Sequence, residues 1–376
     1  MSISLEDAQA FLTEAEHFSR EKVAACSFAP ELPVSLENIH TLSQEAAQLG
    51  LLPQLSGEGF ALWEHTDSQG AMTFNLGLLQ VLAEVNASLA FAWHKQALST
   101  KLLKLAEAEL SLEPLELTML CVGRQGLGRE QLGRYLSSTK DLPQTGQEFL
   151  QDWLDRDQAA VLIAPSQWQN LLWPVWKKGT LRWQLVQRDK LQVQSKARQH
   201  GFDELSAFLV RGNKNNHSYL NFSQDPKQLT LDILKQESLG LLAIAVGSLK
   251  RAMKQTFEFT ALRKQGGHAI NRHPAILQMQ AEISAVLQQA ESNLQHFSAP
   301  LNATSLKQIM HSRMLLQPML CHAASQCMQA HGGVGYMRDV GIEKVFREQN
   351  MLRVLGGGLL EIPLIINGLN QSEKNQ

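Results

Sequence analysis

The sequence predicts a mainly α-helical protein with a small β domain inserted between two helical regions. Apolar residues recur at steps of three and four over residues 1–118 and again over 226–376, which is the period of an amphipathic helix. Residues 119–225 instead carry short apolar or alternating runs bounded by Gly, Asn and Asp, a pattern typical of strands. We therefore expect an N-terminal helical domain (1–118), a middle β domain (119–225) and a C-terminal helical bundle (226–376).

The N-terminal region contains two clear amphipathic segments. The first covers residues 5–15, and the second covers 76–92, where leucine and alanine repeat at the same steps. The segments PELP (30–33) and QLSGEG (54–59) contain the residues that favour turns, so they predict loops between helices.

The middle region has three runs of strand type, at residues 160–164, 181–186 and 207–210. Turn-like pairs such as Lys178-Gly179 separate these runs. Five of the seven tryptophans lie between Trp153 and Trp183. We interpret these tryptophans as the core of the β domain rather than as a platform for a ligand.

The C-terminal region predicts long helices joined by short loops. A helix over 229–262 would be about 50 Å long at ~1.5 Å per residue, and a second begins after Pro274. Because long helices with short connections pack as antiparallel neighbours, these segments predict a bundle. The remaining predicted helices cover residues 305–330, 342–354 and 359–369.

Composition excludes several classes of function. The formal net charge is -2 and the sequence pI is about 6.6, so a broadly basic nucleic-acid surface is not expected. No apolar run reaches the roughly 18 residues of a membrane span, so we expect no transmembrane segment. The four cysteines form no CxxC pair, which favours a reducing, cytoplasmic location. The histidines show no spacing typical of a metal site.

Residues 329–336 (QAHGGVGY) form the most informative motif. A Gly-Gly pair at the end of a helix is explained by capping alone. A third glycine two residues later is not, and a turn with so few Cβ atoms lets backbone N–H groups approach a phosphate or a ring.

The order of motifs around this turn resembles the C-terminal domain of the acyl-CoA dehydrogenase family. The motifs that carry this resemblance are LRKQGGHAI (262–270), QAHGGVGY (329–336), RDVGIEKVFRE (338–348) and RVLGGG (353–358). A weaker resemblance to the family's N-terminal helices rests on LGL (49–51) and EVNASLA (84–90). The resemblance implies an N-terminal helical domain, a middle β-barrel domain and a C-terminal four-helix bundle. It also implies FAD as cofactor, acyl-CoA or an acyl-carrier-protein thioester as substrate, a homodimer or homotetramer, and an electron-transfer flavoprotein as electron acceptor.

Four residues are predicted to hold FAD when the family's roles are carried over. Arg263 would contact the pyrophosphate, for which the fork of a guanidinium is suited, while Gln329, Gly332 and Gly333 would meet the cofactor from the neighbouring subunit. Without the resemblance, Arg263 is also explained as a cation at a helix C-terminus.

Some family positions differ in this sequence. The Phe of the family's R-x-x-F-G is Gly266 here, a Gln that helps to hold FAD is Pro274, and the Thr of its E-G-T turn is Gly358. The family's T-E-P-G-A-G-S-D loop aligns with residues 123–130 (GRQGLGRE), which keep glycines but lack the Thr and Ser, with Arg129 at the Ser position.

The catalytic base is predicted at Glu237. The Glu of the family's E-G-T turn is Gly356 here, and a glycine cannot abstract a proton. A minority of the family places the base on the long helix, 26 residues before the pyrophosphate Arg, and that position in this sequence is Glu237. Glu237 also shares a stripe of the helix with Gly240 and Gly247, which we expect to leave room beside it.

A carboxylate on such an apolar stripe is expected to have a raised pKa through desolvation, which suits a general base. Alternatively, Glu237 has no catalytic role and is a helix glutamate that pairs with a cation such as Lys235. Glu361 is a second candidate base, but the register would have to slip by five residues.

Three functions remain open from the sequence. The first is α,β-dehydrogenation of an acyl thioester with FAD as hydride acceptor, a step of fatty acid metabolism, and Glu237 motivates it. The second is a flavin-dependent oxidase or monooxygenase on the same scaffold, motivated by Gly356. The third is a catalytically degenerate scaffold or binding protein, motivated by the substitutions at Gly266, Pro274, Gly358 and Arg129.

Overall fold

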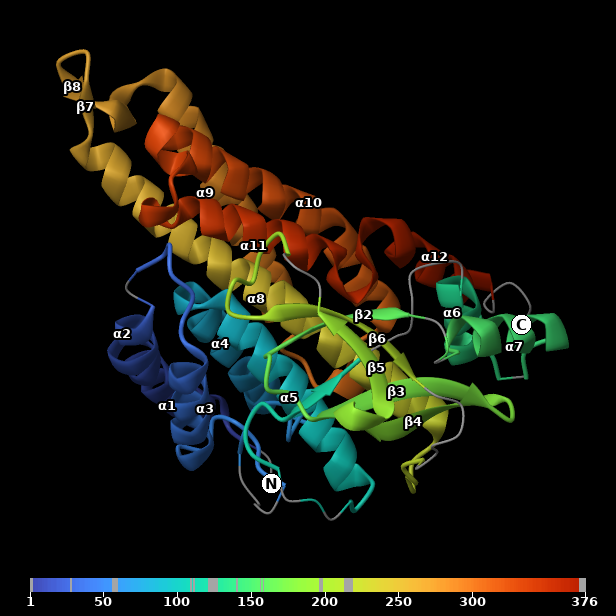
Figure 1. Cartoon of the computed structure of the whole chain (residues 1–376). Helices are drawn as coiled ribbons and strands as arrows, with labels where there is room; N and C mark the ends of the chain where they lie inside the picture. The colour runs from blue at the N-terminus through green and yellow to red at the C-terminus, as the bar shows by residue number, and fades with distance from the viewer. Residues whose placement is uncertain are drawn as a thin grey trace.

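The computed structural model is organised around one long helix, α8 (Pro226–Leu262). It describes residues 3–371 except 28, 56–59, 109, 111, 121–127, 140, 156, 158, 196–198 and 213–218. Helix α8 crosses the molecule diagonally, with the β region beside one end and the β7–β8 hairpin (Lys264–Gln265 and His268–Ala269) at the other (Figure 1). Every side chain from Ile233 to Leu249 is buried, so α8 is a core element of both halves of the protein.

The N-terminal helices cover one side of α8. Helix α1 begins with a capping box, in which the Ser4 side chain accepts from the Asp7 N–H and Asp7 reaches back to the Ser4 N–H. Helix α4 packs closely on α8, because a Cβ at Gly247 would meet the backbone at Gln80. The helices are α1 (Leu5–Phe18), α3 (Leu36–Gln48), α4 (Gln69–Val85) and α5 (Ala87–Leu105), with a π-helical turn (Ser19–Val23) and a short α2 (Ala24–Cys26) after α1.

The predicted small β domain is present, and its described strands form two three-stranded sheets. Their orders are β1-β3-β4, in which β1 and β3 are parallel, and β2-β6-β5, which is antiparallel. The five tryptophans of this region are all buried, so their interpretation as core is confirmed. The strands are β1 (Leu117–Met119), β2 (Ala160–Ala164), β3 (Asn170–Lys177), β4 (Thr180–Gln187), β5 (Leu191–Ser195) and β6 (Ser206–Gly212).

The β region is interrupted by two helices, which the pattern of the sequence did not predict. They are α6 (Gly128–Ser137) and α7 (Gln144–Trp153). Helix α6 lies against the last helix, α12 (Gly358–Gln371), at backbone contact, since a Cβ at Gly133 would meet the Ile365 carbonyl. Arg129, at the start of α6, thereby reaches the Gly356 carbonyl and the Glu361 side chain.

The C-terminal bundle has the helices that the sequence predicts. Helix α9 (Pro274–His296) starts with Pro at its first position, which suits the fixed φ of proline. Helix α10 (Leu306–Ala330) runs parallel to α8, and α11 (Ile342–Val354) and α12 complete the bundle.

The segment Ile342–Gln371 is long and apolar enough for a membrane span by composition. It is, however, two helices separated by a turn in which Gly356, Gly357 and Gly358 all have positive φ, and part of it is buried in the bundle. We therefore read it as a packed element of this fold.

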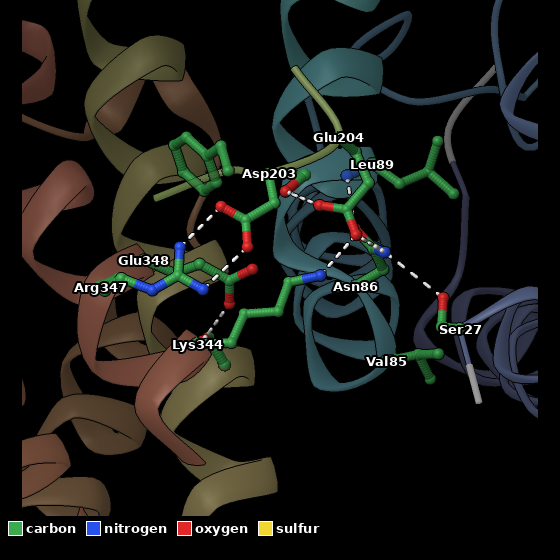
Figure 2. A network of polar contacts seen from close by, with 12 residues as sticks. Ser27, Val85, Asn86, Leu89, Asp203, Glu204, Lys344, Arg347 and Glu348 are labelled. Atoms are coloured by element: carbon green, nitrogen blue, oxygen red, sulfur yellow. Dashed lines mark hydrogen bonds and ion pairs between the residues drawn. The ribbon is translucent and has the colours of Figure 1, made fainter. Parts of the chain in front are cut away.

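A buried polar network joins the three regions of the chain (Figure 2). Glu204, in the loop before β6, forms an ion pair with Lys344 of α11. It also accepts hydrogen bonds from Asn86 (3.0 Å) and from the Ser88 hydroxyl (2.5 Å) at the start of α5. These three partners hold the pKa of Glu204 below its usual value in spite of desolvation.

The network continues along α11 (Figure 2). Arg347 binds both carboxylate oxygens of Asp203, at 2.6 and 2.8 Å, in the bidentate arrangement of a strong ion pair. Glu348 is buried, and from the described residues it accepts one long hydrogen bond, 3.4 Å, from the Ser248 hydroxyl. Burial, with Glu204 nearby, raises the pKa of Glu348 to about 7, although Lys344 acts in the opposite direction.

Candidate functional site

The candidate site lies where α5 crosses α8. Every residue of α5 from Ala87 to Thr100 is buried, so the polar side chains within that stretch need partners inside the protein. Three of them, His94, Lys95 and Gln96, are consecutive. The Gln96 side-chain oxygen accepts from the Leu115 N–H at 2.6 Å, and the other two side chains point to α8.

Glu237 is the shared partner of His94 and Lys95. One carboxylate oxygen, Oε2, lies 2.9 Å from His94 Nε2, and the other, Oε1, forms an ion pair with the Lys95 ammonium group. The side chain of Glu237 is 3% exposed. The structure therefore places the predicted base in the interior, with both of its oxygens engaged.

The tautomer of His94 follows from its second contact. The indole N–H of Trp63 can only donate, and it lies 2.8 Å from His94 Nδ1. Nδ1 is then the acceptor, so the proton is on Nε2 and is donated to Glu237. Burial is the main reason that the pKa of His94 is lowered, which favours this neutral imidazole.

The raised pKa expected for Glu237 is wrong. Burial acts in that direction, but the Lys95 charge and the hydrogen bond from His94 outweigh it, so the pKa of Glu237 is held well below its usual value. Glu237 is thus an anion over the whole physiological pH range. It has the protonation state of a base, but with reduced affinity for a proton in this arrangement.

The expected room beside Glu237 is also wrong. A Cβ at Gly240 would lie 2.5 Å from Nδ1 and 2.7 Å from Nε2 of His94. The imidazole ring therefore fills the space beside Gly240. The backbone of α4 fills the space beside Gly247. The glycines of the stripe serve close packing of helices.

The turn that aligns with the family's E-G-T is occupied by two arginines. A Cβ at Gly356 would lie 2.8 Å from an Nη1 of Arg313, and a Cβ at Gly357 would lie 2.6 Å from Nη1 of Arg129. Arg129 forms an ion pair with Glu361 at 2.5 Å. The second candidate base is therefore also the partner of a cation.

Arg313, from α10, forms no ion pair with any residue that the structure describes. It is fully buried, and its guanidinium donates to the carbonyls of Leu355 (2.9 Å) and Gly356 (3.5 Å). Burial lowers the pKa of Arg313 to about 10, while the negative charge of Glu237 acts in the opposite direction. The region around Gly356 thus carries positive charge where most of the family carries a carboxylate.

The residues predicted for FAD lie together at the far end of the bundle. Arg263 follows the last residue of α8 and is exposed, and it forms no ion pair with any described residue. Gln329 is exposed near the end of α10 and accepts from the Tyr336 hydroxyl at 3.2 Å. The rings of Phe259 and His331 stack with centroids 4.3 Å apart, which brings the end of α10 beside the last turn of α8.

The turn after α10 is open. Gly332 has a positive φ, and a Cβ added at Gly332 or Gly333 would meet no atom within 4 Å. Backbone N–H groups there can be approached from outside. The tip of the hairpin at Gly266 is exposed too, and Pro274 starts α9, so neither supplies a side chain for a hydrogen bond to a cofactor. In the segment that aligns with the family's T-E-P-G-A-G-S-D loop, residues 123–127 lie outside the described residues.

Sequence reasoning missed Trp63, His94, Lys95 and Arg313, and it named Arg129 only as a substitution at the family's Ser position. A signal existed for one pair, because His94 and Lys95 directly follow a stretch, residues 87–93, in which every residue is apolar or small. No pattern marks Arg313, which lies on a helix with other cations.

Comparison with known proteins relates the C-terminal part of the chain to one family. Residues 228–366 match the family model "Acyl-CoA dehydrogenase, C-terminal domain". A probable acyl-CoA dehydrogenase of Bacillus subtilis is 25% identical over 134 residues, which cover 34% of this chain and 34% of that protein. The very long-chain specific acyl-CoA dehydrogenase of Bos taurus is 23% identical over 133 residues, or 35% of this chain and 20% of its own length. The aligned segment thus spans about a third or less of these curated relatives.

Solved structures extend the likeness in fold to the whole chain. An acyl-CoA dehydrogenase from Bacillus anthracis complexed with FAD superposes with a TM-score of 0.73 at 16% identity, over 99% of this chain and 69% of that one. A prolyl acyl carrier protein oxidase superposes with a TM-score of 0.70 at 14% identity, over 96% and 97%. Butyryl-CoA dehydrogenase from Megasphaera elsdenii gives 0.68 at 13%, over 97% and 98%.

Together these findings define the class of protein: it has the mainly helical acyl-CoA dehydrogenase fold, with N-terminal helices, a small β region and a C-terminal helical domain. Its C-terminal part, residues 228–366, resembles the C-terminal domain of acyl-CoA dehydrogenases at low identity.

Proposed function

We propose that this chain is an FAD-dependent oxidoreductase that removes hydrogen from the α and β carbons of an acyl thioester, with Glu237 as the base. The observation that supports the proposal most is the layout of α8. The helix carries a buried, ionised carboxylate in its first half and, 26 residues later, an exposed arginine beside an open glycine turn.

The end of the bundle fits the phosphates of FAD. The Arg263 guanidinium is exposed with no carboxylate partner among the described residues, so its charge is available to a bound anion. The open turn at Gly332 and Gly333 offers backbone N–H groups next to it. Arg263, Gln329, Gly332 and Gly333 would hold the cofactor, and exposed apolar side chains nearby (Leu262, Val334, Tyr336, Met337) suit a second copy of the chain that completes the site.

In this reaction FAD, when bound, supplies the acceptor for the hydride of the β-carbon. The chain's own residues supply the proton chemistry and the orientation. Glu237 would accept the α-proton at a carboxylate oxygen, and His94, held by Trp63, would keep the carboxylate oriented through the Nε2 proton. The burial of α5 and α8 around this group excludes water from the carbanion-like transition state.

Replacement of Arg263 by Gln is expected to weaken FAD binding by about ten- to a hundredfold. A hydrogen bond to a charged group contributes about 1.5–3 kcal/mol, and ~1.4 kcal/mol is tenfold in affinity. Titration of the apoprotein with FAD, followed by the flavin absorption and fluorescence, measures the effect. Arg272→Gln is the matched control, since Arg272 is another exposed cation of the same end of the bundle. Equal losses in the two variants would contradict the role of Arg263.

Replacement of Glu237 by Gln is expected to slow bleaching of the flavin by acyl-CoA about 10²- to 10⁴-fold, which is the usual contribution of a general base. Stopped-flow absorbance of the FAD-loaded protein with a panel of acyl-CoA chain lengths measures it. Since Gln also leaves Lys95 buried without its counter-charge, flavin content and thermal stability are compared with the double variant Glu237→Gln/Lys95→Met. A folded, flavin-loaded Glu237→Gln protein that bleaches at the wild-type rate would exclude Glu237 as the base.

A second function, a catalytically degenerate scaffold or binding protein, is favoured by the two arginines at the Gly356 turn. They put positive charge and side-chain bulk where most of the family has its base. Purified protein with no FAD, and no uptake of FAD when it is added, would support this function. Retention of FAD with oxygen-dependent turnover and no reduction by acyl thioesters would instead indicate an oxidase or monooxygenase.

A further inference from the structure

Glu237 has two partners that differ in how firmly they are held. The His94 ring is fully buried, is fixed at Nδ1 by the Trp63 indole and lies against Gly240, so it cannot move without a rearrangement of α8. Lys95 reaches Glu237 with a flexible four-carbon chain, and its side chain is 10% exposed. Of the two contacts, the one with Lys95 is the one that can open.

A base must come within hydrogen-bond reach of the proton that it removes. Lys95 engages Oε1 and His94 engages Oε2, so a substrate that reaches the carboxylate competes with both of them for its negative charge. Proton uptake by Glu237 would also leave the Lys95 ammonium buried without a counter-charge, which is unfavourable in an interior that excludes water. Proton transfer to Glu237 is therefore favoured when Lys95 leaves the carboxylate before or during the transfer.

Lys95 has a second favourable partner to which it can turn. Its ammonium lies 5.5 Å from the centre of the Phe91 ring, on the preceding turn of α5. Among the described residues, Arg313 of α10 also interacts electrostatically with Glu237, and it is held by the carbonyls of Leu355 and Gly356. When the Lys95 contact opens, Glu237 keeps its contact with the fixed imidazole of His94 and the charge of Arg313.

We propose that Lys95 holds Glu237 in a resting ion pair that must open before Glu237 can accept a proton, so that Lys95 is a positioning residue that gates the base. This inference rests on the proposed function for its kinetic consequence only. The ion pair itself, and its effect on the carboxylate, are properties of the folded chain. They can be measured without any substrate.

The test compares three variants of α5 in the FAD-loaded protein. Lys95→Met removes the charge at nearly constant length, and Lys95→Arg keeps it. Lys104→Met removes a partly buried, ion-paired lysine of the same helix that contacts Glu64 and not Glu237. Stopped-flow bleaching by acyl-CoA is followed across the acidic and neutral pH range. If Lys95→Met does not fold, Lys95→Gln, which can still donate a hydrogen bond, takes its place.

We expect Lys95→Met to bleach at least about tenfold faster than the wild type, because one pKa unit in the base can correspond to up to a tenfold change in rate. The same variant is expected to show a loss of rate on the acidic side that the wild type lacks. Lys95→Arg and Lys104→Met are expected to keep the wild-type pH profile. If the bleaching rate depends on pH in the same way in Lys95→Met and Lys104→Met, Lys95 does not gate Glu237 and has only a structural role.

A second readout does not depend on turnover. The infrared band of a protonated carboxylic acid, taken as the difference between each protein and its Glu237→Gln counterpart, reports when Glu237 binds a proton. If Lys95 gates Glu237, this band is expected to appear, as the pH is lowered, at a higher pH in Lys95→Met than in the wild type or in Lys104→Met. If no protein bleaches with any acyl-CoA, the proposed function fails, while this titration still decides whether Lys95 controls Glu237.

Discussion

Alanine at position 240 is expected to lower the free energy of unfolding by about 3 kcal/mol, the upper part of the range for overpacking a buried contact. The added methyl group would lie 2.5 Å from Nδ1 of His94. That ring cannot step aside, because Trp63 and Glu237 hold its two nitrogens. Either the α5–α8 crossing widens or the ring leaves both partners. Chemical denaturation followed by circular dichroism measures the change.

A double-mutant cycle separates this clash from a general intolerance of Gly240. In a His94→Ala background the ring is absent, so Gly240→Ala is expected to be neutral or to stabilise by up to about 1 kcal/mol through its helix propensity. Gly146→Ala in α7 is the matched control, since a Cβ there meets only the end of the flexible Gln131 side chain. An equal penalty for Gly240→Ala with and without His94 would show that the ring is not the cause.

Replacement of Glu348 by Gln is expected to stabilise the protein at alkaline pH by about 3 kcal/mol. The pKa of Glu348 is raised from 4.5 to about 7, chiefly by burial, and one pKa unit is about 1.4 kcal/mol. A raised pKa in the folded state means that the neutral form is the stable one. Its contribution is complete below pH ~4.5 and is lost as pH rises through about 7. Glutamine keeps the neutral form at every pH.

Equilibrium unfolding of wild type and Glu348→Gln at several pH values between 5 and 9 tests this. The two proteins should differ little at the acidic end, and the advantage of the variant should grow toward pH 8 and then stay constant. Glu14→Gln, on the exposed face of α1, is the control and should show no such growth. A constant difference between wild type and Glu348→Gln at all pH values would mean that Glu348 does not titrate in this range.

Much of the fold could be predicted from the sequence because its elements are long and periodic. The structure confirms a helix that ends at Leu262, a helix that starts at Pro274 and a bundle at the C-terminal end. The same periodicity placed Glu237 on the buried side of α8. Helices α6 and α7 escaped prediction because their sequence is short, polar and interrupted by glycine, so it carries little periodic signal.

The sequence by itself determined the spacing along α8 and the glycine turn after α10, because both are properties of a single continuous segment. Only the tertiary structure decided the electrostatics of the candidate site. His94 lies 143 residues from its partner Glu237 in the chain, and Arg129 lies 227 residues from Gly356. The direction of a pKa shift depends on which charges come within a few ångströms of a buried group. That proximity is set by how α5, α6 and α10 pack, and not by the helix that carries the carboxylate.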